Sequence, residues 1–172
     1  MNIILIGFMA SGKTTVGKAI ARRSGRPFMD LDAVIEEKAG MSIPTIFATV
    51  GEKAFRDLES HVVNTLPISG DAVISCGGGV ILRESNRERL RQRGFVVWLK
   101  STPETVLRNA GRRETRPLLR DKGVDDVAAM LAAREPFYTA TAHDSLEVAA
   151  IGIDAAAERI LMLHDSFAAT LP

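Results

Sequence analysis

The sequence predicts an α/β fold in which helices flank a central five-stranded parallel sheet. Short apolar runs alternate with longer amphipathic stretches, and this alternation is typical of strand–helix–strand units. A glycine-rich segment directly follows the first apolar run and precedes a helical pattern, which indicates a strand–loop–helix unit. The length of 172 residues and the 46% hydrophobic content suffice for a single domain, residues 1–172, with its own core. The predicted strands are 2–6, 28–29, 72–76, 95–99 and 146–149.

The first predicted strand leads into residues 7–14, Gly-Phe-Met-Ala-Ser-Gly-Lys-Thr, which match the phosphate-binding pattern G-x-x-x-x-G-K-[ST]. Glycine at both ends lets backbone N–H groups approach phosphate oxygens that a side chain would obstruct. Lys13 can reach the β- and γ-phosphates, and the Thr14 hydroxyl can bind Mg²⁺. The next helix directs the positive end of its dipole at the anion. We expect a bound nucleoside triphosphate, with contacts from Ala10, Ser11, Gly12, Lys13, Thr14 and Thr15.

Two aspartates, Asp30 and Asp32, follow the second predicted strand. The carboxyl ends of parallel strands meet at one edge of a sheet, so we expect this pair on the same side as the phosphate-binding loop. One carboxylate could organise Mg²⁺ through its water shell, and the other could orient an attacking hydroxyl and accept its proton. The alternative is that Asp32 only caps a helix over residues 33–39, which ends before Gly40.

Arg56 is predicted on a helix that begins at Gly51 and Glu52. It lies beside the apolar positions of that helix, which favours a binding role at the edge of the core. The alternative is a surface ion pair with Glu52 or Glu59, because both lie at helical spacing from the arginine.

Three consecutive glycines, residues 77–79, follow the third predicted strand, where many phosphate-loop enzymes have an acidic residue. Glycines there let the backbone approach a ligand closely and donate N–H groups to it, while Ser75 could hold a metal-bound water. A flexible turn without a binding role is the alternative.

Residues 111–123 interrupt the alternation, because they are rich in arginine and contain little apolar content beyond Leu118 and Leu119. A segment of this kind predicts a lid that closes over bound ligands.

Arg134 is an isolated charged residue whose position in the sequence indicates a role in binding. If residues 125–135 form a helix, Val127, Leu131 and Arg134 fall on one face at helical spacing. A buried charge needs a partner, and a guanidinium can hold a carboxylate with two parallel hydrogen bonds. The alternative is an arginine that reaches solvent from the end of the helix before Pro136.

Overall charge and composition restrict the class of partner. The net charge is only +1, so a small anionic substrate is expected rather than nucleic acid or a membrane surface. No apolar run approaches the length of a membrane span, and the first residues enter a strand without the pattern of a signal peptide. The single cysteine, Cys76, fits a reducing compartment and a buried structural role. We therefore expect a cytoplasmic protein.

Taken together, these segments resemble the shikimate kinase family in order and spacing, from the first strand to about Val148. The resemblance implies a P-loop kinase fold with a lid at about 111–123 and a substrate-binding region at about 32–60. It also implies transfer of the ATP γ-phosphoryl group to the 3-hydroxyl of shikimate, a step toward aromatic amino acids. The matching segments are residues 7–14, Asp30-x-Asp32, Gly51-Glu52-x-x-Phe55-Arg56-x-x-Glu59, Gly77-Gly78-Gly79, Arg116-Pro117-Leu118-Leu119 and Arg134-x-x-x-Tyr138.

The resemblance further implies roles for individual residues. Asp32 would serve as the base, Arg116 would close on the phosphates, and Arg108 would stack near adenine. The implied catalytic residues are Lys13, Asp30, Asp32 and Arg116. The residues implied to bind shikimate are Asp32, Arg56, Gly77, Gly78, Gly79 and Arg134. Those implied to lie near Mg²⁺ are Thr14, Asp30 and Ser75.

Two departures from the family pattern leave alternatives open. Residues 106–116 align in two registers, so Asn109 or Arg112 is the alternative to Arg108 beside adenine. Ala10 stands where many members carry glycine, which is tolerated if the backbone there has a negative φ. The alternative functions are another small-metabolite kinase, such as gluconate kinase, or a regulatory nucleotide-binding module without catalysis. We expect a monomer.

Overall fold

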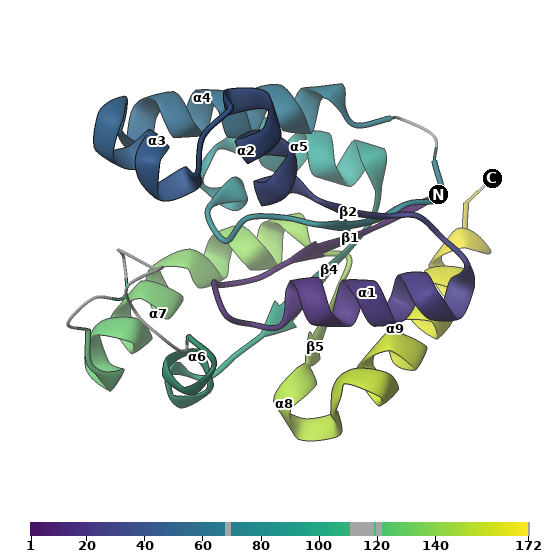
Figure 1. Ribbon diagram of the computed structural model, residues 1–172. Helices are drawn as coiled ribbons and strands as arrows, with labels where there is room; N and C mark the ends of the chain where they lie inside the picture. Colours follow the sequence, from purple (N-terminus) through teal and green to yellow (C-terminus); the bar gives the residue numbers. More distant parts are fainter. Residues whose placement is uncertain (68–69, 111–118, 120–121, 172) are drawn as a thin grey trace.

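The computed structural model of the chain describes residues 1–67, 70–110, 119 and 122–171. Strands and helices alternate through this part of the chain, as predicted (Figure 1). The elements are β1 (Asn2–Ile6), α1 (Lys13–Ser24), β2 (Phe28–Asp30), α2 (Leu31–Ala39), α3 (Ile43–Thr49), α4 (Gly51–Thr65), β3 (Val73–Ser75), the 3₁₀-helix η1 (Val80–Leu82), α5 (Glu84–Arg93), β4 (Gly94–Lys100), α6 (Pro103–Asn109), α7 (Val124–Thr141), β5 (Asp144–Glu147), α8 (Val148–Ile151) and α9 (Ile153–Ala168).

Within the described residues, five strands form one sheet in the order β2-β3-β1-β4-β5, and every neighbouring pair is parallel. This confirms the predicted sheet. Because the strands run in the same direction, their carboxyl ends lie at one edge. The register places Asp30 opposite Ser75, and Ser75 opposite Leu5, so the segments that follow β2, β3 and β1 are neighbours there.

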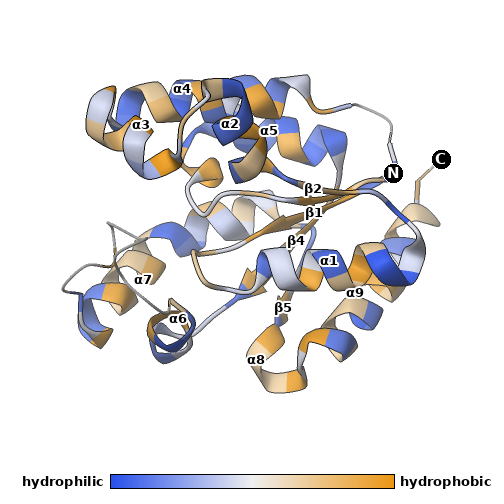
Figure 2. Ribbon diagram, viewed as in Figure 1, coloured by the Kyte–Doolittle hydropathy of each residue, from blue (hydrophilic) through white to orange (hydrophobic). Residues whose placement is uncertain are grey.

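Helices cover both faces of the sheet (Figure 1), with α1 and α9 on one face and α4, α5 and α7 on the other. Alternate residues of β1 serve the two cores: Ile4 and Ile6 pack in one, Ile3 and Leu5 in the other. Figure 2 shows the resulting hydrophobic strands between helices of mixed hydropathy. Burial on both faces explains why the strands could be recognised as uninterrupted apolar runs.

The last strand differs from its prediction. β5 covers Asp144–Glu147, whereas the apolar run had indicated residues 146–149. Val148 and Ala149 instead begin the short helix α8. β5 is an edge strand that pairs only with β4 among the described residues, and its side chains are half-buried or exposed. An edge strand does not need a continuous apolar run, so the hydrophobic signal placed it too late.

Two helices also begin or end differently from the prediction. α2 begins at Leu31, because the side chain of Asp30 accepts a hydrogen bond from the Asp32 amide and caps the helix. The interpretation of Asp32 as the cap is therefore wrong. α7 continues through Pro136 to Thr141, so Arg134 does not lie at a helix end. A proline removes one helical hydrogen bond, and burial of Tyr138 and Thr141 beyond it favours continuation.

Candidate active site

A cavity of about 930 Å³ opens at the carboxyl edge of the sheet. It brings together every predicted site residue that the structure describes. These are Ala10, Ser11, Gly12, Lys13, Thr14, Thr15, Asp30, Asp32, Arg56, Ser75, Gly77, Gly78, Gly79, Arg108 and Arg134. Arg116, Arg112 and most of the predicted lid lie outside the described residues. The predicted substrate-binding region 32–60 spans α2, α3 and much of α4, which supply one wall.

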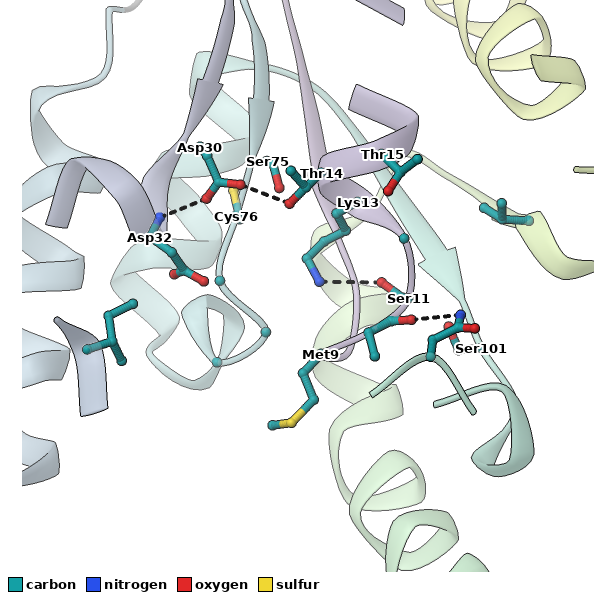
Figure 3. Close-up of a pocket in the computed structure, with 18 of the residues that line it drawn as sticks. Met9, Ser11, Lys13, Thr14, Thr15, Asp30, Asp32, Ser75, Cys76 and Ser101 are labelled. Carbon is teal, nitrogen blue, oxygen red and sulfur yellow. Dashed lines mark hydrogen bonds between the residues drawn. The ribbon is translucent and has the colours of Figure 1, made fainter. Parts of the chain in front are cut away.

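The phosphate-binding loop between β1 and α1 is closed around the amine of Lys13. Its Nζ donates hydrogen bonds to the carbonyl oxygens of Gly7 at 2.9 Å and Phe8 at 2.8 Å, and to Ser11 Oγ at 3.3 Å. Figure 3 shows the Lys13 amine directed at Ser11 within the cavity. The lysine is buried, so it fixes the loop from the inside as well as facing the phosphate site.

Two glycines and one alanine of this loop have positive φ angles. A Cβ on Gly7 would lie 2.6 Å from the Leu99 carbonyl oxygen, so space excludes a side chain there. Gly12 has open space around it and is required by its φ of 90° instead. Ala10 has φ 62°, contrary to the negative φ that was expected to make alanine tolerable. Its carbonyl accepts a hydrogen bond from Asn109 Nδ2 at 3.2 Å, and the left-handed conformation costs about 1 kcal/mol.

The Asp30 carboxylate joins the phosphate-binding loop to α2. Thr14 Oγ1 donates to Asp30 Oδ2 at 2.9 Å, and the Asp32 amide donates to Asp30 Oδ1 at 3.1 Å (Figure 3). Ser75, buried at the end of β3, lies opposite Asp30 in the sheet. Among the described residues, no group of three or more histidine, cysteine or acidic side chains is placed to bind a metal. The site therefore offers one carboxylate flanked by two hydroxyls.

Asp32 has a different environment from Asp30. In Figure 3 its carboxylate and the Lys13 amine lie on opposite sides of the same opening. Burial raises the pKa of Asp32 above its usual range, and the negative charge of Asp30 adds to this effect. The positive charges of Lys13 and Arg56 act against it. Asp32 is thus close to both ends of the cavity and binds a proton more readily than an exposed aspartate.

Arg56 forms the ion pairs that were considered as an alternative, but it forms them in a buried wall of the cavity. Its Nη1 lies 2.9 Å from Glu59 Oε2 and its Nη2 lies 3.3 Å from Glu52 Oε1. The side chain of Glu59 is only 2% exposed, and burial raises its pKa. The idea of a surface pair is therefore wrong for Glu59. Glu52 is exposed and contributes a weaker contact.

Each glycine of residues 77–79 has a close neighbour where a Cβ would stand. A Cβ on Gly77 would lie 2.6 Å from Asp32 Oδ1 and 3.2 Å from Glu59 Oε1. On Gly78 it would lie 2.9 Å from the Met9 amide nitrogen, and on Gly79 it would collide with the Arg56 guanidinium. The turn therefore packs against Asp32, the phosphate-binding loop and Arg56 at the same time. This close packing argues against the flexible turn that was the alternative.

Arg134 projects from α7 into the same cavity, as the helical spacing predicted. Its Nη1 donates to the Gly78 carbonyl at 3.3 Å, and its guanidinium carbon lies 5.0 Å from the centre of the Phe8 ring. Within the described part of the chain, no carboxylate lies within ion-pair distance of it. The guanidinium therefore keeps hydrogen-bond donors that an anionic ligand could use.

Most other residues of the cavity were not predicted to belong to the site, although Asn109, the alternative to Arg108 beside adenine, also lines it. Ser101 and Lys100 line it at the end of β4. Because the carboxyl ends of parallel strands lie at one edge of the sheet, their position could have been predicted. Near them, the exposed Arg108 donates to Thr105 Oγ1 at 3.4 Å. One wall of the cavity is apolar and includes the tilted rings of Phe47 and Phe55, whose centres lie 4.8 Å apart. In the sequence, these residues could not be distinguished from residues that pack in the core. The remaining members are Met9, Glu36, Ile43, Pro44, Glu59, Cys76, Asn109, Val148, Ala149, Gly152 and Ile153.

Two further observations concern what the single cysteine and the hydropathy of the sequence had predicted. Cys76 is buried in the cavity floor, as expected, and burial raises the pKa of its thiol. In the part of the chain that the structure describes, we find no helix whose length and hydropathy would let it traverse a bilayer.

A phosphate-binding loop that leads from the central strand into a helix, together with aspartates and arginines in one cavity, defines a P-loop kinase that acts on a small molecule. A sequence profile of shikimate kinase matches residues 9–163. A shikimate kinase of Moorella thermoacetica is 47% identical over 137 residues, which cover 80% of this chain and 79% of that protein. The chain belongs to the shikimate kinase family.

Comparison with solved structures agrees with this assignment. The structure of shikimate kinase from Acinetobacter baumannii in complex with shikimate matches with a TM-score of 0.90 at 39% identity, covering 99% of this chain and 95% of that one. A gluconokinase from Sinorhizobium meliloti matches with a TM-score of 0.56 and 19% identity, so it shares the fold alone. The predicted family, fold and enzyme class are confirmed: the protein is an ATP-dependent kinase that acts on an alcohol group.

Proposed function

We propose that the protein transfers the γ-phosphoryl group of ATP to the 3-hydroxyl of shikimate and releases ADP and shikimate 3-phosphate. The observation that carries this proposal is the shared cavity, which is lined both by the phosphate-binding loop and by Arg56 and Arg134. The family assignment favours this acceptor over gluconate, and it favours an enzyme over a regulatory module.

The two arginines would bind the carboxylate of shikimate beside the backbone of residues 77–79. Arg134 has donors directed into the cavity, and Arg56 is fixed by Glu59 at 2.9 Å. A guanidinium held in this way presents its remaining N–H groups in a fixed plane, which suits a planar carboxylate. This arrangement would place the ring hydroxyls of the acid toward Asp32.

Asp32 would accept the proton of the attacking hydroxyl. Its burial raises its pKa, which makes the carboxylate a better proton acceptor than an exposed aspartate. Lys13 would stabilise the charge that develops on the transferred phosphoryl group. Most of the catalytic effect would come from positioning and charge, because phosphoryl transfer needs little covalent chemistry from the protein.

The residues near Asp30 fit a Mg²⁺ ion that accompanies ATP. Mg²⁺ prefers oxygen ligands and is usually bound by one or two carboxylates together with waters and phosphates. Thr14 donates its hydroxyl hydrogen to Asp30, so its oxygen lone pairs are available to a cation. Ser75 would hold a water of the ion. When bound, the cation would neutralise charge on the β- and γ-phosphate oxygens.

Several finer assignments stay predictions. They are the role of Arg116 and the lid at 111–123, the contact of Arg108 with adenine, the substrate-binding role of 32–60, the monomeric state and the cytoplasmic location.

The test is a coupled assay that measures ADP release by the wild-type protein with ATP, Mg²⁺ and three classes of acceptor. We expect kcat/KM for shikimate to exceed that for gluconate and for nucleoside monophosphates by at least about 100-fold, because the acceptor contacts act in the transition state. Preference for gluconate or a nucleotide would overturn the assignment of the substrate. Absence of turnover with every acceptor would favour the regulatory module.

A further inference from the structure

Tyr138 lies one helical turn beyond Arg134 on α7 and is buried, with 1% of its surface exposed. It does not line the cavity. Its hydroxyl instead donates a hydrogen bond of 2.8 Å to the carbonyl oxygen of Gly78, a residue that does line it. Burial raises the pKa of Tyr138 to about 12, so the hydroxyl keeps its proton and remains a donor at neutral pH.

The ring of Tyr138 is itself held in place. It stacks on the indole of Trp98 with 5.4 Å between ring centres and 14° between planes. Trp98 belongs to β4, next to β1 in the centre of the sheet. The tyrosine ring is therefore packed against the central sheet, which restricts where its hydroxyl can lie.

The Gly78 carbonyl receives a second donor. Arg134 Nη1 approaches it at 3.3 Å, compared with 2.8 Å for the tyrosine hydroxyl. A carbonyl oxygen has two lone pairs, so these two donors occupy both. The shorter bond belongs to Tyr138 and the longer one to Arg134, whose guanidinium lies over the Phe8 ring and also acts on the Tyr138 hydroxyl, where it lowers the pKa against the effect of burial.

The Gly78 peptide cannot move away on its other side. A Cβ there would lie 2.9 Å from the Met9 amide nitrogen, so the backbone of Gly78 is pressed against the phosphate-binding loop. The peptide is thus fixed between α7 and the loop, with Tyr138 as the hydrogen-bond donor that anchors it from the α7 side.

We propose that Tyr138 is a positioning residue for the acceptor. Through the Gly78 carbonyl it fixes the peptide at the cavity wall and keeps Arg134 available for the substrate carboxylate. This inference rests on the proposed function, in which Arg134 binds that carboxylate. Without the tyrosine hydroxyl, Gly78 would accept from the guanidinium alone, and the carbonyl would compete with the substrate for Arg134.

The test compares Tyr138→Phe with wild-type protein, using whichever acid the wild-type protein prefers as acceptor. Phenylalanine keeps the ring on Trp98 and removes only the hydroxyl. We expect KM for the acid to rise about 5- to 10-fold, the effect of one hydrogen bond, while KM for ATP and kcat stay within about 2-fold. Using the preferred acid separates this test from the assignment of shikimate, which the acceptor comparison decides.

Thr141→Val is the matched control. Thr141 is fully buried one turn further along α7, and its hydroxyl donates to the Phe137 carbonyl at 2.6 Å without contacting Gly78. If Tyr138 were only structural, both variants would lower Tm and leave KM for the acid unchanged. That result would overturn the proposal.

A double variant tests whether Tyr138 acts through Arg134. In the background of Arg134→Gln, Tyr138→Phe should change KM for the acid by less than about 2-fold, because the residue it positions is already absent. An equal effect in both backgrounds would overturn the proposal. If Arg134→Gln itself left KM for the acid unchanged, both the proposed clamp and this inference would fail.

Tyr138 is the single tyrosine of the sequence, which allows a measurement on a protein with its phenol intact. Replacement of tyrosine by 3-fluorotyrosine gives one ¹⁹F resonance. We expect the acid to shift this resonance as Arg134 leaves Gly78, with ATP alone causing a smaller shift, and Arg134→Gln to abolish the response to acid. A resonance that does not respond to acid in the otherwise wild-type protein would overturn the proposal even if Tyr138→Phe failed to fold.

Discussion

The two halves of the cavity are built in different ways. The part of the nucleotide half that binds the phosphates comes from one uninterrupted segment, residues 7–15, and relies on backbone groups and a single lysine. The acceptor half is assembled from α2, α4, α7 and the turn at 77–79, which are far apart in the sequence. A contiguous loop can be changed with local effects, whereas the residues of an assembled site also hold the fold together.

The two halves of the cavity also differ in their charged groups. Lys13 in the nucleotide half bonds to neutral carbonyls. The acceptor half contains two carboxyl groups, the half-buried Asp32 and the buried Glu59, whose pKa values are raised by the loss of solvent around them. Substitution of these carboxyl groups or of their ion-pair partner Arg56 should therefore alter stability and its pH dependence, while substitution of Lys13 should act mainly on turnover.

The largest expected effect belongs to the nucleotide half. Lys13→Ala should remove on the order of 3 kcal/mol or more of transition-state stabilisation, because it deletes one preorganised charge contact. The protein should still fold, because Lys13 belongs to none of the three hydrophobic clusters of the core. Steady-state kinetics and thermal unfolding measure both effects. Lys18→Ala, an exposed lysine of the same helix, is the control. Near-normal turnover by a folded Lys13→Ala protein would contradict the assignment.

Asp32→Asn should lower turnover by about 100-fold or more, because the amide cannot accept the proton. It should also raise Tm at neutral pH, since burial disfavours the charged carboxylate. The folded state binds this proton more tightly than the unfolded state. Asp32 therefore stabilises the fold more at acidic pH, and this contribution is lost as pH rises through the raised pKa.

The activity of the wild-type protein should have the opposite pH dependence. The base must be ionised, so kcat/KM should decline as pH falls through the raised pKa of Asp32. Profiles of kcat/KM and of Tm against pH, for wild type and Asp32→Asn, measure both trends. Glu59 contributes to stability in the same direction, so the variant should reduce the pH dependence of Tm without removing it. A Tm that falls on substitution would show that the carboxylate supports the fold.

The two arginines of the acceptor half should respond differently to removal. Arg56→Ala and Arg134→Ala should each raise KM for the acid by about 10-fold or more, since each loses a charge-assisted bond. Arg56→Ala should also lower the free energy of unfolding by on the order of 3 kcal/mol, because Glu59 stays buried without its partner at 2.9 Å. Arg134→Ala should leave stability nearly unchanged. Denaturant unfolding separates the two, and equal losses would contradict the comparison.

The smallest expected effect concerns the backbone of the nucleotide half. Ala10→Gly should increase the free energy of unfolding by up to about 1 kcal/mol, because glycine adopts the φ of 62° without the strain of a Cβ. Ala21→Gly, within α1, should instead lower it by about 1 kcal/mol. Chemical denaturation of both variants measures the difference. A destabilised Ala10→Gly protein would mean that unfolded-state entropy outweighs the strain.

Sequence patterns predicted those features that depend on local chemistry. The five parallel strands followed from apolar runs, and the phosphate-binding loop followed from the spacing within residues 7–14. The edge strand β5 was misplaced, because its half-exposed side chains do not form an apolar run. The end of α7 was misjudged for a related reason: packing beyond Pro136 outweighs the local effect of proline.

The acceptor half illustrates a second limit. Arg134 could be found from helical spacing, but its contact with Gly78 joins residues 56 positions apart. The burial of Arg56 with Glu59 likewise depends on how α4 packs, and spacing alone was compatible with a surface pair. The φ of Ala10 is set by the closure of the loop around Lys13, which no local preference of alanine indicates.

The closure of the loop around Lys13 has a consequence for the free energy of nucleotide binding. A lysine side chain loses about 2 kcal/mol of rotamer freedom when it is fixed in one conformation. Here the bonds from Nζ to Gly7 and Phe8 restrict the side chain before ATP arrives, so that loss occurs during folding and not during binding. The positive charge is therefore already held beside the phosphate site, but a hydrogen bond to a phosphate oxygen must replace one of the three that Nζ donates to Gly7, Phe8 and Ser11, so the ordering cost is reduced while one exchange of partners remains.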